Sequence, residues 1–123
     1  MDTQIFLWVI TDDARLSAAL RSHYRDPEQQ LYLSIASIWE MLIKVGLSKL
    51  PLPQPSTPYI LRQMERNGLE LLPMRISHLA AMEKLPALHR DPFDRLLVAQ
   101  AMAESMPMLT SDPQMRGYGV EVL

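Results

Sequence analysis

The chain alternates short apolar runs with longer helix-like segments, and this alternation limits its fold more than any other feature. Four runs, at residues 31–35, 69–73, 106–110 and 120–123, have the length and composition of buried strands. Strands that alternate with helices in this way form a parallel sheet with helical crossover connections. The sequence therefore predicts an α/β fold in which helices flank a short parallel sheet.

Capping residues mark where the helices are expected to begin. The run Ser37-Ile-Trp-Glu40 has the form of a capping box, which predicts a helix that starts at Ser37 and places Glu40 in its first turn. This helix should end within residues 46–51, where glycine and proline occur. Further helices are predicted at residues 57–67 and 76–85.

The segment Asp91-Pro-Phe-Asp94 has the composition of a helix N-terminus. It supplies a carboxylate at the N-cap, a proline at the first helical position and a second carboxylate in the first turn. The apolar run at residues 95–103 then predicts a helix buried against the sheet. In this interpretation Asp91 is a cap, which is worth about 1 kcal/mol, and is not a ligand.

The composition limits the chemistry that the chain can perform. Its 123 residues suffice for one domain, and the absence of cysteine excludes zinc fingers, disulfide scaffolds and thiolate nucleophiles. A net charge of −2 gives no overall attraction to nucleic acid, so any phosphate site must be local. Because no apolar run approaches ~18 residues and no signal-peptide pattern is found, we expect a cytoplasmic protein that does not enter a membrane.

Carboxylates are expected to gather at one edge of the sheet. Ligands of open α/β sheets bind beyond the carboxyl ends of the strands, where helix N-termini meet. Glu40 and Asp94 fall in predicted first turns and Asp112 follows a predicted strand, while Asp2 would join them if a strand lay immediately upstream. Oxygen ligands without Cys or His partners suit Mg²⁺ or Mn²⁺. Such a site would act on a phosphodiester.

Each carboxylate also has a purely structural explanation. Glu40 and Asp94 fit residues stabilised by a helix macrodipole at ~0.3–1 kcal/mol each, and Asp112 before a proline fits an Asx-turn. The three histidines lie in different segments without metal-ligand spacing, so surface or capping roles are expected for His23, His78 and His89. The residues alone leave the structural and the functional interpretations of the carboxylates open.

Four segments together resemble a known family. They are Asp2-Thr-Gln-Ile-Phe-Leu-Trp8, Ser34-Ile-Ala-Ser-Ile-Trp-Glu40, His89-Arg-Asp-Pro-Phe-Asp-Arg-Leu-Leu-Val-Ala-Gln-Ala101 and Leu109-Thr-Ser-Asp112. In this order and spacing they resemble PIN-domain ribonucleases, specifically the VapC-type toxins of bacterial toxin–antitoxin pairs. The resemblance spans nearly the whole chain and implies a single PIN-like domain over residues 1–123.

The resemblance implies a divalent-metal-dependent endoribonuclease. By this resemblance Asp2 and Asp94 match the family's firmest Mg²⁺ or Mn²⁺ ligands. Glu40 and Asp112 match positions that bind the metal through water or bind a second ion. It also implies an RNA substrate, a cognate antitoxin that neutralises the toxin, and a homodimer. Nearby hydroxyl groups would orient the carboxylates or act as plain caps; they belong to Thr3, Ser37, Thr110 and Ser111. Nearby basic side chains would contact the RNA backbone or be solvated charges; they are Lys44, Arg90, Arg95 and Arg116. Lys44 lies four residues after Glu40 and would alternatively form an ion pair with it.

The chain departs from this family at its beginning. In the family the first aspartate closes a central strand, whereas only Met1 precedes Asp2 here. We hypothesise a misassigned or truncated start, which an intact mass of the native protein equal to these 123 residues would refute. A missing strand favours an alternative function, a catalytically inactive PIN-like module that binds RNA or protein. A phosphatase-like or nucleotide-binding protein is disfavoured because no glycine-rich phosphate loop is present.

Overall fold

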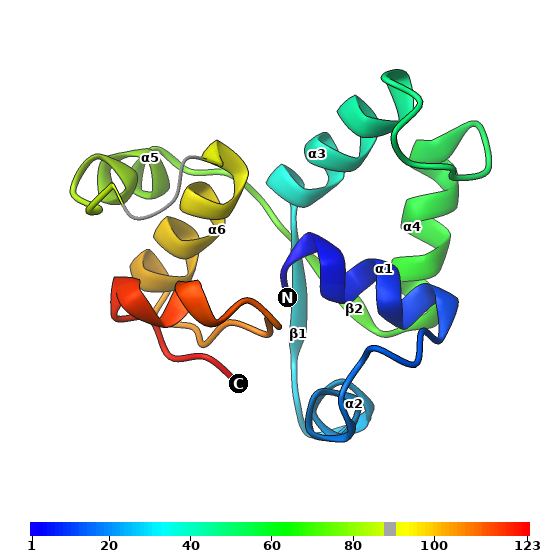
Figure 1. The fold of residues 1–123 in the computed structure, drawn as a ribbon, viewed down its shortest axis with the longest axis horizontal. Coiled ribbons are helices and arrows are strands. Elements are labelled where there is room, and N and C mark those ends of the chain that lie inside the picture. Colours follow the sequence, from blue (N-terminus) through cyan, green and yellow to red (C-terminus); the bar gives the residue numbers. More distant parts are fainter. Residues whose placement is uncertain (88–90) are drawn as a thin grey trace.

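Two parallel strands lie at the centre of the molecule with helices on either side (Figure 1). The structure is a computed structural model and describes residues 1–87 and 91–123. The predicted α/β class is confirmed. In chain order the elements are α1 (Thr3–Thr11), α2 (Ala18–Arg25), β1 (Leu31–Ser34), α3 (Ile35–Gly46), α4 (Ser56–Arg66), β2 (Leu69–Leu72), α5 (Ile76–Glu83), α6 (Pro92–Ala103) and the 3₁₀ helix η1 (Pro113–Tyr118).

The sheet confirms two of the predicted strands. β1 pairs with β2 in parallel, with Leu31 opposite Leu69 and Ser34 opposite Leu72. The connection between them consists of α3 and α4, as a parallel pair requires. Leu33 is fully buried because it points from β1 into the core beneath these helices.

The other two predicted strands do not form. Residues 106–110 and 120–123 meet only at a single bridge, between Met108 and Val122. Met108 donates to Glu121 O at 2.7 Å and accepts from Leu123 N at 2.8 Å, so this contact lies on one side of the segment only. Pro107 has no amide hydrogen to donate, and a ladder of one residue is too short to make a strand.

The start of α3 differs from its prediction. Ser34, not Ser37, is the N-cap, and its hydroxyl accepts from Ala36 N at 3.0 Å. Since β1 runs directly into the helix, Ser37 is already inside it and Glu40 lies in the second turn, not the first. The helices predicted at residues 57–67 and 76–85 are confirmed with ends that differ by one or two residues, and the helix predicted after the Asp91 cap spans Pro92–Ala103 as expected.

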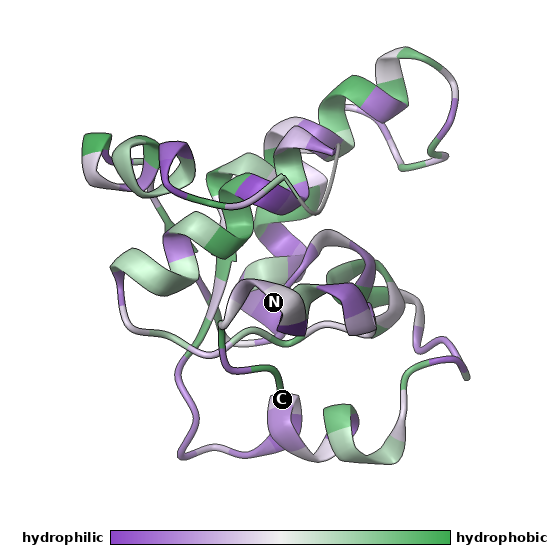
Figure 2. Ribbon diagram, turned by 60° about the vertical axis from the view of Figure 1, so that its left-hand side comes forward, coloured by the Kyte–Doolittle hydropathy of each residue, from purple (hydrophilic) through white to green (hydrophobic). Residues whose placement is uncertain are grey.

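The core consists of three apolar clusters. One packs α1, β1, α3 and α4 together around Phe6, Leu33 and Met41. A second joins α6 to the C-terminal segment around Val98 and Met115, and the third lies between α1 and α2. The helices carry hydrophilic as well as hydrophobic stretches (Figure 2). Among the described residues, no helix has the length and apolar character needed to span a bilayer.

Candidate functional site

All four predicted carboxylates line one cavity of about 280 Å³. They come from four separate parts of the chain: Asp2 precedes α1, Glu40 lies in α3, Asp94 is in the first turn of α6 and Asp112 precedes η1. Folding therefore brings together residues that are far apart in the sequence. The remaining lining residues are Thr3, Gln4, Leu7, Lys44, Asp91, Ser111 and Met115.

Asp2 is held on both of its carboxylate oxygens. One accepts from Ile5 N at 2.9 Å, which makes Asp2 the N-cap of α1, and the other accepts from the hydroxyl of Thr110. Only 6% of Asp2 is exposed. Burial raises the pKa of the Asp2 carboxyl, and the hydrogen bonds from Thr110 and Ile5 oppose this rise. The carboxylate is thus fixed in orientation in a poorly solvated position.

Glu40 is also fixed, by one hydroxyl and one ammonium group. Thr3 donates to Oε1 at 2.6 Å, and Lys44 donates to Oε2 at 2.9 Å from the next turn of α3. The hydrogen bond to Glu40 raises the pKa of Lys44. The ion pair that the sequence allowed between these two residues is present. Glu40 is buried, so Lys44 balances a charge that has little contact with water.

We expect Lys44→Met to lower the free energy of unfolding by about 1 kcal/mol, because the Glu40 carboxylate would keep only its bond from Thr3. Lys44 is half exposed, which limits the effect. Urea denaturation measures it. Lys49→Met is the matched control, since Lys49 is exposed and makes no ion pair with any described residue. Equal losses for both variants would contradict a stabilising role for the Lys44–Glu40 pair.

The other carboxylates lie at helix starts. Asp91 caps α6 by accepting from Phe93 N at 2.9 Å, as predicted, and Asp112 caps η1 by accepting from Gln114 N at 2.9 Å. Helix N-termini favour negative charge, which helps several carboxylates to coexist. The sequence interpretation missed that Asp91 lines the cavity too. Its position three residues before Asp94, at the N-cap of α6, is the signal that could have indicated it.

The predicted hydroxyl residues divide into two groups. Thr3 and Thr110 hydrogen-bond to carboxylates of the cavity, which confirms the orienting contacts expected of them. Ser111 lines the cavity. Ser37 does not reach it, because its hydroxyl is buried inside α3 and has no hydrogen-bond partner among the described residues. Its predicted capping role belongs to Ser34.

Of the predicted basic residues that the structure describes, Lys44 alone lines the acidic cavity. Arg95 instead donates to Pro86 O at 2.8 Å and so ties α6 to the loop after α5. Arg116 lies in η1 and is not among the lining residues, and Arg90 is outside the described residues. Five carboxylates against one ammonium leave the described part of the cavity strongly acidic.

The histidines are not part of this cavity within the described residues. His78 is completely buried, accepts from Arg75 N at 3.0 Å as a cap of α5, and contacts Glu104 at 2.8 Å. This agrees with the predicted capping role. His23 lines a different cavity, and His89 lies outside the described residues.

The acidic side chains of the cavity have the chemistry that a hard divalent cation requires, but within the described residues they do not form a complete coordination shell. Every acidic group at the cavity offers carboxylate oxygen, which Mg²⁺ and Mn²⁺ prefer. Among the described residues, no three acidic or imidazole groups lie close enough together to hold a metal by themselves. Mg²⁺ usually binds through one or two carboxylates, with water and substrate phosphate completing its shell. Two of these carboxylates are therefore sufficient to bind a divalent cation.

Comparison with known proteins places the chain in a family. The PIN domain matches residues 1–121, which is nearly the whole chain. Ribonuclease VapC16 of Mycobacterium tuberculosis (strain ATCC 25618 / H37Rv) is 38% identical over 60 residues, which make up 49% of this chain. The match covers 43% of that relative, so the chain spans less than half of its length. The extent of the PIN-domain match decides the family: this chain belongs to the PIN-domain family.

Proposed function

We propose that this chain is a divalent-metal-dependent endoribonuclease of the VapC type that folds as a single PIN-like domain. The observation that carries the proposal is the convergence of Asp2, Glu40, Asp94 and Asp112 on one cavity from four separate segments. Membership of the PIN-domain family and the similarity to a protein named as a ribonuclease support the same activity.

The four carboxylates have different proposed roles in metal binding. Asp2 and Asp94 would hold Mg²⁺ or Mn²⁺, and Glu40 and Asp112 would assist through water or hold a second ion. When bound, the metal supplies an activated water and polarises the phosphodiester. Thr110 and Thr3 keep the Asp2 and Glu40 carboxylates in fixed orientations, which reduces the reorganisation needed for catalysis. The acidity of the cavity would repel RNA unless a cation were bound, so metal and substrate bind together.

The proposed partners are RNA, a cognate antitoxin and a second copy of the chain. Large apolar side chains are exposed along α3 and at its C-cap, among them Trp39 at 57% and the capping residue Leu47 at 59% exposure. Apolar side chains gathered on one helix are typical of a surface that binds another protein. Because α3 also carries Glu40, a protein that covers this helix would lie beside the cavity. These features support binding by an antitoxin or a second copy.

The proposal is tested by removing and restoring the metal. We expect the purified chain to cleave mixed single-stranded RNA in Mn²⁺, to stop when excess EDTA is added, and to resume when Mn²⁺ exceeds EDTA. Gel electrophoresis of labelled RNA measures the cleavage. A variant without the Asp94 charge, purified in the same way, controls for contaminating nuclease. Cleavage that continues unchanged in EDTA would contradict the proposal.

A second function is favoured by the ion pair between Lys44 and Glu40. This ammonium group pairs with one of the four carboxylates that the proposal assigns to metal binding, which would suit a catalytically inactive module that binds RNA or protein. RNA binding measured by fluorescence anisotropy, without cleavage in Mg²⁺ or Mn²⁺, would favour this function. Metal-dependent cleavage would exclude it.

A further inference from the structure

The acidic cavity contains a positive charge of its own. Among the described residues, Lys44 is the one basic side chain that lines it. The Lys44 ammonium group lies 2.9 Å from Oε2 of Glu40, one turn away on α3. The Glu40 side chain is only 7% exposed, whereas that of Lys44 is 46% exposed. A full positive charge is therefore in place beside a buried carboxylate that the proposed function assigns to metal binding.

The same ammonium group also interacts with the start of α6. The carboxylates of Asp91 and Asp94 attract it electrostatically, in addition to the carboxylate of Glu40. Asp91 is the N-cap of α6 and Asp94 lies in the first turn of that helix. Lys44 therefore interacts with carboxylates from both helices that border this part of the cavity.

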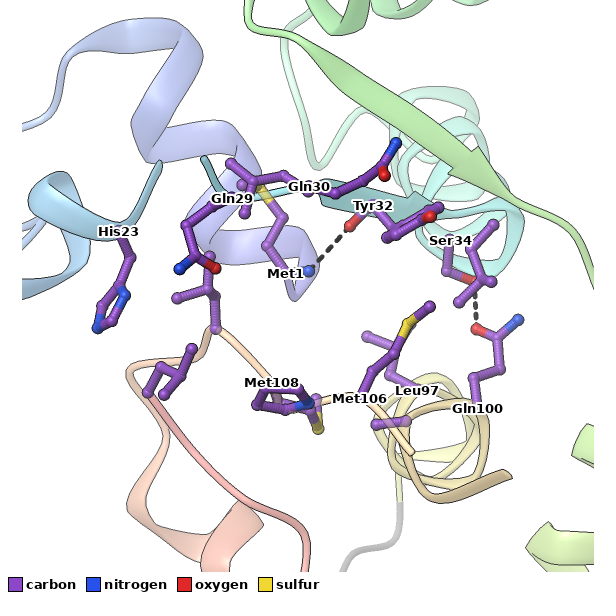
Figure 3. A pocket seen from close by; sticks show the side chains of 16 residues that line it. Met1, His23, Gln29, Gln30, Tyr32, Ser34, Leu97, Gln100, Met106 and Met108 are labelled. Atoms are coloured by element: carbon purple, nitrogen blue, oxygen red, sulfur yellow. Dashed lines mark hydrogen bonds between the residues drawn. The ribbon is translucent and has the colours of Figure 1, made fainter. Parts of the chain in front are cut away.

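Two side-chain contacts hold α3 against α6. The hydroxyl of Ser34, the N-cap of α3, donates to Oε1 of Gln100 in α6, a bond that Figure 3 draws as a dashed line. Trp39 of α3 and Phe93 of α6 meet edge to face, with ring centroids 5.2 Å apart. Packing thus sets the position of α3, and of the Lys44 stem on it, relative to the carboxylates at the start of α6.

A second divalent ion held by Glu40 and Asp112 would have to lie beside this ammonium group. In two-metal sites the ions are about 3.5–4 Å apart, so a second ion cannot move far from the first. Lys44 donates to Oε2 of Glu40, and Thr3 donates to Oε1 at 2.6 Å. A divalent cation at Glu40 would therefore meet a like charge at close range, which weakens its binding.

Asp2 offers a more suitable place for a metal ion than Glu40 does. Its carboxylate accepts from Ile5 N and from the Thr110 hydroxyl, and both of these hydrogen-bond donors are neutral. Mg²⁺ needs only one or two carboxylates when water and phosphate complete its shell. The acidic groups are not packed around two ions, since within residues 1–87 and 91–123 no three acidic or imidazole groups lie close enough to hold a metal.

We propose that Lys44 takes the place of a second divalent ion, so that the acidic cavity binds a single Mg²⁺ or Mn²⁺. This inference rests on the proposed function and decides between the two roles given there to Glu40. Because Lys44 balances its charge, Glu40 assists through water and does not hold an ion of its own. Lys44 is a positioning residue, which keeps the single ion at Asp2 and Asp94.

The experiment counts the Mn²⁺ ions that the full chain binds. The electron paramagnetic resonance signal of free Mn²⁺ is lost on binding, so a titration gives the number of bound ions and their affinities without measuring cleavage. We expect one Mn²⁺ per wild-type chain, with any second ion at least about 100-fold weaker. The cavity in Figure 3 should not contribute, because none of its described lining residues has an acidic side chain.

Variants at Lys44 separate its charge from its packing. Lys44→Gln keeps a hydrogen-bond donor but removes the charge, so the second Mn²⁺ should bind at least about tenfold more tightly than in wild type. Lys44→Met should have the same effect, with circular dichroism to verify that both variants are folded. Lys44→Arg keeps the charge and should still bind one ion. Lys49→Met is the matched control, since Lys49 is exposed and outside the cavity, and it should also bind one.

The outcomes distinguish this inference from the proposed function. One ion on wild type and two on Lys44→Gln would support it. Two ions of similar affinity on wild type, or an unchanged count and affinity in Lys44→Gln, would overturn it while the nuclease proposal remained. If the wild-type chain bound no Mn²⁺, the proposed function itself would be overturned, and the role of Lys44 with it.

Discussion

Asp94→Asn is expected to lower metal-dependent RNA cleavage by at least about 100-fold while the fold remains intact. Asparagine keeps the size of the side chain but removes the charge that a divalent cation requires. Asp94 lies in the first turn of α6, where losing a carboxylate costs only a fraction of a kcal/mol of stability. Initial cleavage rates in Mn²⁺ measure the first effect, and thermal unfolding measures the second.

Asp91→Ser is the matched control for this experiment. Asp91 lines the same cavity three residues earlier, but its carboxylate is engaged in capping Phe93 N. Serine preserves that cap, so the variant should fold and cleave within about threefold of wild type. If Asp91→Ser loses as much activity as Asp94→Asn, the loss of any one negative charge in the cavity is sufficient to lower the cleavage rate. Wild-type cleavage by Asp94→Asn would remove Asp94 from the proposed metal ligands.

Phe6→Ala is expected to reduce the free energy of unfolding by about 3–5 kcal/mol. Phe6 is completely buried where α1 packs on the sheet, in one cluster with Leu33, Met41 and Ile60. Removing its ring leaves a cavity that these side chains fill only in part. A loss of this size is a large share of the ~5–15 kcal/mol that stabilises a typical domain. Urea denaturation followed by circular dichroism measures it.

Ile76→Ala serves as the control for Phe6→Ala. Ile76 begins α5 and is 80% exposed, so its truncation should change the free energy of unfolding by less than about 0.5 kcal/mol. A loss at Phe6 no greater than the loss at Ile76 would mean that α1 is not anchored to the sheet. That outcome would also remove the basis for placing Asp2 at the cavity, because Asp2 caps α1.

The parts of the fold that the sequence predicted are those decided by local signals. The start of α6 follows from Asp91 and Pro92, and the structure has its cap and first residue where predicted. The strands at residues 31–35 and 69–73 were identifiable because each is apolar, short and followed by a helix-forming segment. The grouping of the carboxylates followed from the general rule on where α/β folds bind ligands.

The predictions that were wrong concern features that depend on a neighbouring segment or on competition between similar residues. Residues 106–110 are apolar enough for a strand, but a strand needs a backbone neighbour, and this segment bridges only Val122. Ser34 and Ser37 are both suitable caps, and only the end of β1 decides between them. That Thr3 would orient a carboxylate was expected, but its pairing with Glu40 in particular joins residues from different helices, which no local pattern encodes.

The hydrogen bond between Asp2 and Thr110 spans 108 positions of a 123-residue chain. A ribosome makes the chain from its N-terminus, so Asp2 leaves the exit tunnel long before Thr110 exists. Until then the Asp2 carboxylate lacks one of the two donors that orient it, and Asp112 is absent as well. A growing polypeptide therefore cannot assemble the acidic cavity until residues 110–112 have been made, and any activity of the cavity begins only after that point.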